Sequence, residues 1–306
     1  MNYLNLKELL TIIIPTLNEV EGIGLVIDEL LSIDIPKDSI LVVDGGSTDG
    51  TVDVVKSKGV KLIIQEGKGK ASAIATALKH VKTPYIAVLD GDYTYPAKHI
   101  PELLKKALEG YDEVLGSRKY VEGTQPLIYR LGNYILTKLF NLLFNTKLSD
   151  VLTGMYVVKT SKLHELNFEF SGFSIEVELV THIASTSGRV TEIPIEYRRR
   201  LGKKKLGVLD GFKIARDIFR LTWRYNPALL IFLLGSLLLI PGLILGSYVA
   251  YHYFFTGIKY YVRGLIAIML TLTGFQSLIA TLITLYVKRV ELRILRSIES
   301  LRSSKE

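Results

Sequence analysis

Two long stretches without a charged side chain lie in the C-terminal third of this chain. They cover residues 225–258 and 264–287, and neither contains Asp, Glu, Lys or Arg. A helix needs roughly 20 apolar residues to cross the hydrocarbon core of a bilayer, so each stretch is long enough. Buried helices of a globular protein are the alternative, but such helices seldom run so far without a charge. The sequence therefore predicts a transmembrane hairpin over residues 225–287.

Positive charge is concentrated beside this hairpin. The whole chain has a formal net charge of +8, and residues 198–224 alone carry ten Lys or Arg against two Asp. Residues 288–306 are also rich in Lys and Arg. Basic residues next to a membrane span favour anionic lipids and mark the cytoplasmic side. We therefore expect a multi-pass protein of the cell membrane whose N-terminal domain and both termini are cytoplasmic.

Other classes of protein are not expected. Nucleic-acid binding is the competing explanation of the charge, but the chain has no groove-reading motif. The N-terminus lacks a basic region followed by a long apolar stretch and a cleavage site, so it does not predict a signal peptide. The chain has no Cys, which excludes disulfides and thiolate metal sites.

Apolar segments of strand length alternate with helical segments through the first 160 residues. This alternation predicts an α/β fold in which helices cover both faces of a mostly parallel sheet. The expected strands are residues 10–14, 40–43, 61–64, 85–89 and 113–115, followed by 155–158 and 190–197. The expected helices are residues 18–32, 50–58, 69–81, 99–109, 131–144 and 175–184.

Four parts of the chain follow from these patterns. Residues 1–206 form the α/β domain, 207–224 a juxtamembrane amphipathic helix, 225–287 the hairpin and 288–306 a basic cytoplasmic tail. The amphipathic helix is expected to lie in the membrane interface, with an ordinary surface helix as the alternative. A Gly-x-x-x-Gly pattern from Gly242 to Gly246 favours close helix packing and leads to the hypothesis of a homo-oligomer.

Asp90 and Asp92 are the strongest functional signal in the α/β domain. They directly follow the apolar strand 85–89, and a buried strand cannot hold two unpaired anions. At the carboxyl end of the strand they can share a divalent cation that also binds a diphosphate. A turn that merely ends the strand is the alternative for an isolated pair. This pair is not isolated.

Polar residues follow the other strands of the expected sheet as well. Ligands of such sheets bind beyond the carboxyl ends of the strands, so these side chains are candidates for contacts with a nucleotide. An Asp can accept hydrogen bonds from a base or ribose, Gly permits close approach, and Lys can meet phosphate. The candidates are Pro15, Asn18 and Glu19 after the first strand, Asp44 and Gly46 after the second, and Lys68 or Lys70 after the third.

In this order and spacing, the segments IPTLNE, VVDGGSTDGT, GKGKASA and LDGDYTYP resemble family 2 glycosyltransferases of the GT-A fold. The resemblance covers roughly residues 10–206. Within that family the chain is most similar to polyprenyl-phosphate hexose synthases, which include dolichyl-phosphate mannose synthase. Matching elements are Gly116-Ser117-Arg118, Arg130, Asp150 to Met155, Gly172 to Glu178, and Arg200 to Leu206.

The resemblance implies transfer of one hexose from a nucleotide sugar to a dolichyl or polyprenyl phosphate, with inversion at the anomeric carbon. It implies that Arg118 and Arg130 hold the acceptor phosphate. It implies Mg²⁺ or Mn²⁺ on Asp90 and Asp92, with Asp92 as the principal ligand. The residues implied to bind the donor, in addition to those after the strands, are Glu176, Arg200 and Lys205.

This sequence departs from the family pattern at three points. Thr94 stands where those synthases often carry a Gln that helps to bind metal, which argues against a third protein ligand. Lys204 replaces a Ser of the loop that closes on the diphosphate. Three consecutive arginines leave the register of that loop open between Arg199 and Arg200. The donor remains open among GDP-mannose, UDP-glucose and UDP-N-acetylglucosamine.

Two other functions compete with this one. A processive polysaccharide synthase of the same superfamily is expected to carry a Q-x-x-R-W pattern near the membrane, and the nearest sequence here is Leu221-Thr222-Trp223-Arg224. A membrane-tethered binding protein with an inactive transferase domain is the second alternative. The intact aspartate pair and both acceptor arginines argue against it.

Overall fold

The computed structural model describes residues 3–120, 124–166, 175–186, 188–202 and 207–303. The chain divides into two compact units, Met1–Ile218 and Phe219–Glu306. The boundary falls inside helix α9 (Val208–Tyr225).

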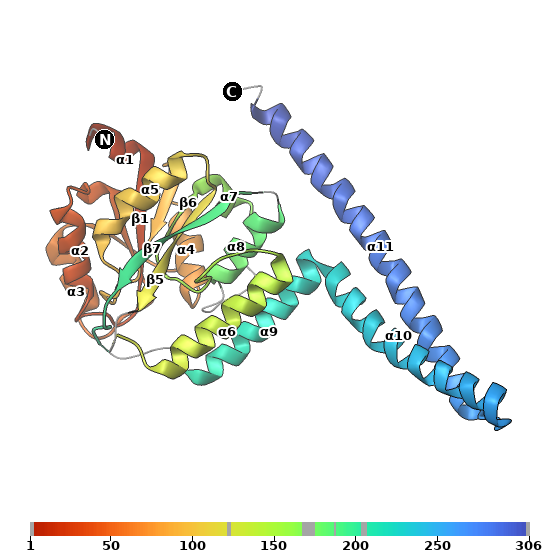
Figure 1. The fold of residues 1–306 in the computed structure, drawn as a ribbon. Helices are drawn as coiled ribbons and strands as arrows, with labels where there is room; N and C mark the ends of the chain where they lie inside the picture. Colours follow the sequence, from red (N-terminus) through yellow and green to blue (C-terminus); the bar gives the residue numbers. More distant parts are fainter. Residues whose placement is uncertain (1–2, 121–123, 167–174, 187, 203–206, 304–306) are drawn as a thin grey trace. The chain divides into compact units, whose positions relative to one another are not determined.

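The first unit is built on one seven-stranded sheet (Figure 1). The strands are β1 (Leu10–Thr16), β2 (Ile40–Asp44), β3 (Lys61–Ile64), β4 (Tyr85–Val88), β5 (Glu113–Tyr120), β6 (Tyr156–Lys159) and β7 (Val190–Tyr197). Their spatial order is β3-β2-β1-β4-β6-β5-β7. Only β6 runs antiparallel to its neighbours, β4 and β5. The predicted α/β fold with a mostly parallel sheet is confirmed.

Helices cover both faces of this sheet. They are α1 (Tyr3–Leu9), α2 (Ile23–Ser32), α3 (Thr51–Lys58), α4 (Lys70–Leu78), α5 (Ile100–Leu108), α6 (Leu127–Phe144), α7 (Thr160–His164) and α8 (Ile175–Ser185), with 3₁₀ turns η1 (Lys37–Ser39) and η2 (Ala97–His99). Helices α2, α3 and α5 contribute to the main hydrophobic core against one face. Helix α4 packs against β1 and β2, and α8 against β7.

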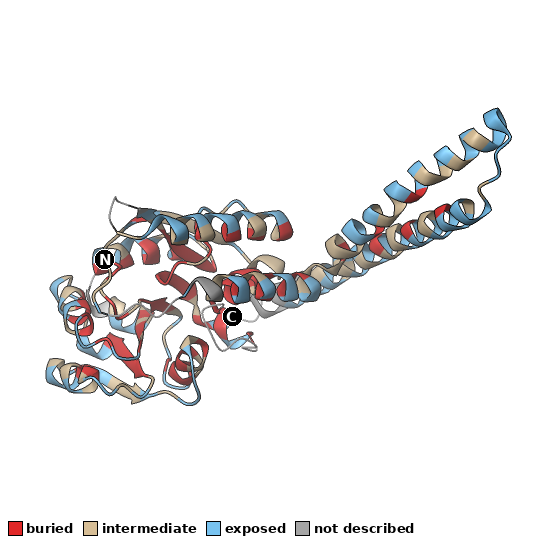
Figure 2. Ribbon diagram, turned by 90° about the horizontal axis from the view of Figure 1, so that it is seen from below, coloured by how far each residue is buried: buried red, intermediate tan, exposed pale blue. Residues whose placement is uncertain are grey.

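Burial follows the strand pattern (Figure 2). All five residues of β2 are buried, because the strand has a neighbour on each side and helices above and below. Strand β3 lies at the edge of the sheet, and Lys61 and Ile64 are exposed. Continuous apolar sequence is typical of strands covered on both faces, and this explains why the central strands were predictable.

One predicted helix begins later than expected. Helix α2 starts at Ile23, not at Asn18. Asn18 has a φ of 51°, in the left-handed region that Asn tolerates better than most residues. The carbonyl of Glu19 then accepts hydrogen bonds from the amides of Gly22 and Ile23 and begins the helix. The residues between β1 and α2 therefore form a loop at the carboxyl edge of the sheet.

The second unit is formed largely by two long helices, α10 (Pro227–Tyr251) and α11 (Tyr261–Ser303), joined through a short π-helical turn η3 (His252–Thr256). The segments Pro227–Thr256 and Tyr261–Ile294 are long and apolar enough to cross a membrane, and few of their residues are buried. Glycines bring the two helices close together: a Cβ at Gly242 would lie 2.7 Å from the amide of Thr271. Gly242, the first glycine of the Gly-x-x-x-Gly pattern, therefore packs against α11 within the same chain.

Candidate active site

A cavity of about 670 Å³ opens at the carboxyl ends of β1 and β4. Its lining includes eight of the residues predicted for the site, and apolar side chains from α6 and α9 form part of the wall. The predicted residues in the lining are Pro15, Glu19, Lys70, Asp90, Asp92, Arg118, Glu176 and Arg200. The sheet therefore brings together side chains that are far apart in the sequence, at the edge where ligands of such sheets bind.

Asp90 is paired with a buried lysine. Lys70 Nζ lies 2.6 Å from Asp90 Oδ1 and 2.7 Å from Glu176 Oε1. The side chains of Lys70 and Glu176 are only 13% and 6% exposed. Burial disfavours the ammonium, but Asp90 and Glu176 outweigh it and raise the pKa of Lys70. Burial raises the pKa of Glu176, while Lys70 opposes that change. Lys70 of α4 and Glu176 of α8 therefore hold the Asp90 carboxylate in position.

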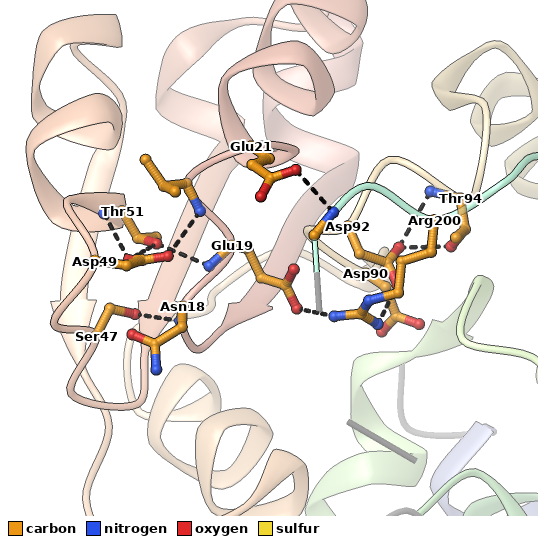
Figure 3. A network of polar contacts seen from close by, with 12 residues as sticks. Asn18, Glu19, Glu21, Ser47, Asp49, Thr51, Asp90, Asp92, Thr94 and Arg200 are labelled. Atoms are coloured by element: carbon orange, nitrogen blue, oxygen red, sulfur yellow. Dashed lines mark hydrogen bonds and ion pairs between the residues drawn. The ribbon is translucent and has the colours of Figure 1, made fainter. Parts of the chain in front are cut away.

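Asp92 is paired with an arginine from another part of the chain (Figure 3). Arg200 Nη1 lies 2.6 Å from Asp92 Oδ2, and Arg200 Nη2 donates to Glu19 Oε1. The hydroxyl of Thr94 donates to Asp92 Oδ1 over 2.5 Å, and the Thr94 amide donates to the same oxygen. Burial and the charge of Asp90 raise the pKa of Asp92, whereas Arg200 and Thr94 act in the opposite direction. Thr94 therefore orients the carboxylate.

Arg200 belongs to a short segment that follows β7, residues 198–202, which we call the strap. The Leu201 amide donates to the carbonyl of Asp92 over 3.2 Å. The Gly202 amide donates to Glu21 Oε2 over 3.1 Å. Arg198 Nη1 lies 2.7 Å from Glu29 Oε1. The strap is thus attached to the loops after β1 and β4 and to helix α2 at points other than Arg200.

Arg118, at the other side of the cavity, is clamped by an aspartate. Its Nε lies 2.6 Å from Asp150 Oδ2, and its Nη2 lies 2.8 Å from Asp150 Oδ1. Nη2 also donates to the Leu152 carbonyl over 3.0 Å, and Asn133 Nδ2 donates to Asp150 Oδ1. Burial would raise the pKa of Asp150, but Arg118 and Asn133 lower it below its ordinary value. The guanidinium plane is therefore held in one orientation.

Three of the predicted donor residues brace loops and are absent from the cavity lining. Asn18 Oδ1 accepts from the Thr48 amide, and the Asn18 amide donates to Ser47 Oγ. Asp44 is 1% exposed, and its oxygens accept from the amides of Gly46 and Ser47 and from the Ser47 hydroxyl. Gly46 has a φ of 90°, which a non-glycine residue would adopt at a cost. These residues shape the loops that carry the lining.

Two further predicted residues are Arg130 and Lys205. Arg130 lies on α6, whose residues Tyr129, Gly132 and Asn133 do line the cavity, but Arg130 itself does not. Lys205 lies outside the described residues. The sequence left open whether Arg199 or Arg200 is the arginine of the donor loop. Both residues line the cavity, and Arg200 contacts Asp92.

Several lining or supporting residues were not identified as site residues from the sequence. Asp150 and Gly154 belong to a segment quoted for the family resemblance, yet their partners could not be read from it. Tyr197 ends β7 and lies beneath Arg118, whose guanidinium is 5.4 Å from the ring centroid. Gln65 directly follows β3 and lines the cavity. The rule that ligands bind after strands would have found Tyr197 and Gln65.

The donor set suits a hard divalent cation. Asp90 and Asp92 supply carboxylate oxygens, which Mg²⁺ and Mn²⁺ prefer. In the part of the chain that the structure describes, no group of three or more His, Cys, Asp or Glu side chains could hold a metal ion. A cation here would take its remaining ligands from a bound diphosphate and water. In this structure the two carboxylates have Lys70 and Arg200 as counter-ions.

A comparison with protein families assigns the chain to a family. Residues 11–166 match the model for glycosyl transferase family 2. The chain belongs to glycosyl transferase family 2. The family resemblance expected from the motifs is confirmed, and this glycosyltransferase carries its Asp90–Asp92 pair within the matched segment.

Two curated relatives are similar over much of the transferase. It is 31% identical over 273 residues to glycosyltransferase AglJ of Haloferax volcanii, which covers 87% of this chain and 89% of the relative. It is 32% identical over 205 residues to a dolichyl-phosphate hexose transferase of the same organism, which covers 66% of this chain and 88% of the relative.

Among solved structures, the transferase is similar to glucosyl-3-phosphoglycerate synthase from Mycobacterium tuberculosis. The TM-score is 0.58 at 21% identity, with 71% of this chain and 78% of the other covered. That synthase was solved in complex with Mn²⁺, uridine diphosphate and phosphoglyceric acid. At this identity the likeness shows that the two proteins share a fold.

Proposed function

We propose that the enzyme transfers a single hexose from a nucleotide sugar to a dolichyl or polyprenyl phosphate, with inversion and with the help of a divalent metal. One observation carries this proposal. A single cavity has an aspartate pair suited to a metal-bound diphosphate, a clamped arginine suited to a phosphate, and an apolar wall from Ile128, Leu136 and Ile214. A lipid phosphate needs both the arginine and the apolar wall.

The donor side is the part of the cavity around β1 and β4. When bound to Asp90 and Asp92, Mg²⁺ or Mn²⁺ would stabilise the negative charge of the leaving nucleoside diphosphate. Arg200 lies beside Asp92 and can add a planar guanidinium to that diphosphate. Lys205 is proposed to add a further charge from the same loop.

The acceptor side is centred on Arg118. Its guanidinium is fixed by Asp150 and lies against Tyr197, so little conformational freedom is lost when a phosphate binds. Arg130 is proposed as a second contact to the phosphate. A phosphate monoester is largely anionic near neutral pH, so one of its oxygens can attack the anomeric carbon without a general base. The bond from that carbon to the diphosphate breaks, and the leaving group keeps the electron pair.

Exposed apolar side chains on α6 support a lipid acceptor. Those on this helix are Leu127, Ile128, Leu131, Tyr134, Ile135 and Leu142. A soluble surface helix would expose few such side chains together. Helix α9 exposes Phe212 beside Lys213 and Arg216, in agreement with an amphipathic helix over residues 207–224. We propose that both helices contact the membrane interface.

The relatives support the same assignment. One is named for hexose transfer to dolichyl phosphate. Structures of the mycobacterial synthase with Mn²⁺ and uridine diphosphate glucose support a metal and a nucleotide sugar on this fold. The donor of this enzyme is proposed to be GDP-mannose, UDP-glucose or UDP-N-acetylglucosamine.

The chain is proposed to sit in the cell membrane with residues 225–287 as a two-span hairpin. Residues 1–206 would then be the catalytic domain on the cytoplasmic side, and residues 288–306 a basic tail on that side. Lys and Arg at both ends of the hairpin support this topology. A homo-oligomer stays a hypothesis, since Gly242 already packs against Thr271 within the hairpin.

The test is to incubate the purified full-length enzyme with each of the three nucleotide sugars, a polyprenyl phosphate and Mn²⁺. We expect one donor to yield a lipid carrying one hexose unit, identified by mass. Asp92→Asn should lower turnover by about 100-fold or more, because the leaving charge loses its stabilising cation. Arg118→Lys should raise the KM for lipid phosphate by about 10-fold, and the donor KM should hardly change.

Two outcomes would count against the proposal. A product carrying several sugars would favour a processive synthase. Absence of any glycolipid with all three donors, in an enzyme that still binds nucleotide, would point to another acceptor class.

A further inference from the structure

Both aspartates of the Asp90–Asp92 pair hold a cation supplied by the protein itself. Lys70 Nζ lies 2.6 Å from Asp90, and Arg200 Nη1 lies 2.6 Å from Asp92. A divalent metal at this pair would compete with them for the charge of the same two carboxylates. The metal must therefore share the site with these two internal cations or displace one of them.

The structure holds Lys70 firmly. It is the first residue of α4, and its second partner, Glu176, belongs to α8. Lys70 and Glu176 are both nearly buried. If Lys70 left, two carboxylates at the floor of the cavity would lose their counter-ion, which is costly in a buried site. We expect Lys70 to remain in place when ligands bind.

Arg200 is held less firmly. Its side chain is 26% exposed, and two carboxylates that it contacts, Glu19 and Asp92, line the cavity. The strap is attached independently through the Leu201 amide, the Gly202 amide and the Arg198 side chain. The guanidinium can therefore move away from Asp92 without release of the strap.

A donor diphosphate offers Arg200 a better partner. Guanidinium groups bind phosphate oxygens with two parallel hydrogen bonds, as they bind carboxylates. A divalent metal at Asp92 repels the guanidinium, whereas a diphosphate bound to that metal attracts it. When metal binds alone, the ion pair between Arg200 and Asp92 is lost and nothing replaces it. When metal binds together with a diphosphate, Arg200 gains the diphosphate as a new partner.

We propose that Arg200 is an exchangeable counter-ion that occupies Asp92 in the free enzyme and transfers to the donor diphosphate when metal binds. The exchange makes the binding of metal and of donor interdependent. Each ligand then raises the affinity for the other by the same factor, as linkage requires. This inference rests on the proposed function, since it assumes a diphosphate donor.

The experiment measures Mn²⁺ binding without turnover. Free Mn²⁺ is followed by electron paramagnetic resonance as it is added to the full-length enzyme, with no acceptor present. The variants are wild type, Arg200→Gln, Arg200→Lys and Arg198→Ala. We expect Arg200→Gln to bind Mn²⁺ alone about 10-fold more tightly than wild type. Arg200→Lys should fall between the two, because it keeps the charge but loses the planar fork.

Arg198→Ala is the matched control on the same strap. Arg198 pairs with Glu29 and stacks on Tyr93, and it is absent from the cavity lining. Its removal should leave the Mn²⁺ affinity unchanged. An equal gain in Arg198→Ala and Arg200→Gln would overturn the inference, because loosening of the strap would then explain both. Unchanged Mn²⁺ affinity in Arg200→Gln and in Arg200→Lys would overturn it as well.

A second set of titrations adds UDP or GDP. In wild type one of these nucleotides should raise the Mn²⁺ affinity about 10-fold or more, and in Arg200→Gln the increase should be clearly smaller. A wild-type enzyme whose Mn²⁺ affinity is the same with and without both nucleotides would refute the coupling. Because these titrations need no acceptor, failure of glycolipid synthesis would not affect them, and the two proposals can fail separately.

Discussion

The two halves of the Asp90–Asp92 pair show how the same chemical contact can serve two purposes. Lys70, whose side chain is 13% exposed, meets Asp90 and the buried Glu176, so this cation has two carboxylate partners at the inner part of the site. Arg200 meets Asp92 at the rim of the cavity, on a segment attached by its neighbours. Distances are the same in both pairs, so geometry alone does not separate them. Burial and the attachment of each cation do.

The comparison suggests that the two cations have different roles in the site. The buried lysine sets the position of Asp90 permanently, because its loss would leave charge in a medium that solvates it poorly. The partly exposed arginine can be exchanged for a ligand at small cost, since water and phosphate both compensate it. Four predictions test how far burial decides the importance of a charged group in this protein, from the largest expected effect to the smallest.

Removal of the buried cation should cost most. Lys70→Met leaves Asp90 and Glu176 without their counter-ion, and we expect a loss of about 3–5 kcal/mol in the free energy of unfolding. Denaturant titration of the detergent-solubilised enzyme measures this loss. The double variant Lys70→Met, Glu176→Gln should recover part of it, because the second buried charge is then also gone. A loss below that of an exposed ion pair would contradict the assignment of Lys70 as a fixed counter-ion.

The position of Asp90 can be disturbed without any change in charge. A Cβ at position 154 would lie 2.0 Å from Asp90 Oδ2, so Gly154→Ala must push this carboxylate aside. We expect turnover to fall by about 100-fold, the size of effect that a small misplacement of a reacting group can have. Gly132→Ala is the control, because Gly132 also lines the cavity and nothing lies within 4 Å of the added Cβ. Equal turnover in both variants would argue against a need for the observed Asp90 geometry.

Glu113 is a buried carboxyl for which the described residues provide no counter-ion, and its pKa shows the effect of burial without such a partner. It is fully buried, and neither of its carboxyl oxygens has a hydrogen-bond partner among the described residues. Burial and the nearby Glu176 raise the pKa of Glu113 well above its ordinary value. The folded state therefore retains a proton that the unfolded chain releases. The contribution of Glu113 to stability should therefore be fully present below the unfolded-state pKa and should decline as the pH rises towards the folded-state pKa.

The variant Glu113→Gln tests this sign. Its stability relative to wild type should grow with rising pH, by about 1.4 kcal/mol for each pH unit between the unfolded and folded pKa values. Denaturant titrations of both proteins at a series of pH values measure the difference. A difference that does not change with pH would mean that Glu113 is ionised in the fold.

The smallest effect is expected for an ion pair on the surface. Lys98 Nζ lies 2.8 Å from Glu196, and both side chains are more than half exposed. Lys98→Ala should change the free energy of unfolding by less than about 1 kcal/mol and leave turnover at the wild-type level. A large loss in either quantity would show that exposure is a poor guide to the importance of an ion pair in this protein.

Much of the fold could be predicted because it depends on local patterns. The apolar runs of the strands, the turn residues after them and the charge-free stretches can be recognised within short windows of sequence. Helix α2 was predicted too early, since the left-handed conformation of Asn18 depends on bonds to Ser47 and Thr48 in another loop. The nucleotide contact predicted for Asp44 stays a prediction, and the sequence did not reveal that its oxygens also accept hydrogen bonds from the amides of Gly46 and Ser47.

The sequence by itself determined which residues end the strands, and therefore that two carboxylates meet at one edge of a parallel sheet. Only the tertiary structure decided which cation each carboxylate holds. Lys70 contacts Glu176, which lies 106 positions later in the sequence, and Arg200 contacts Glu19, from which it is separated by 181 positions. Such pairings depend on how helices and strands pack in three dimensions, and no periodicity along the chain encodes them.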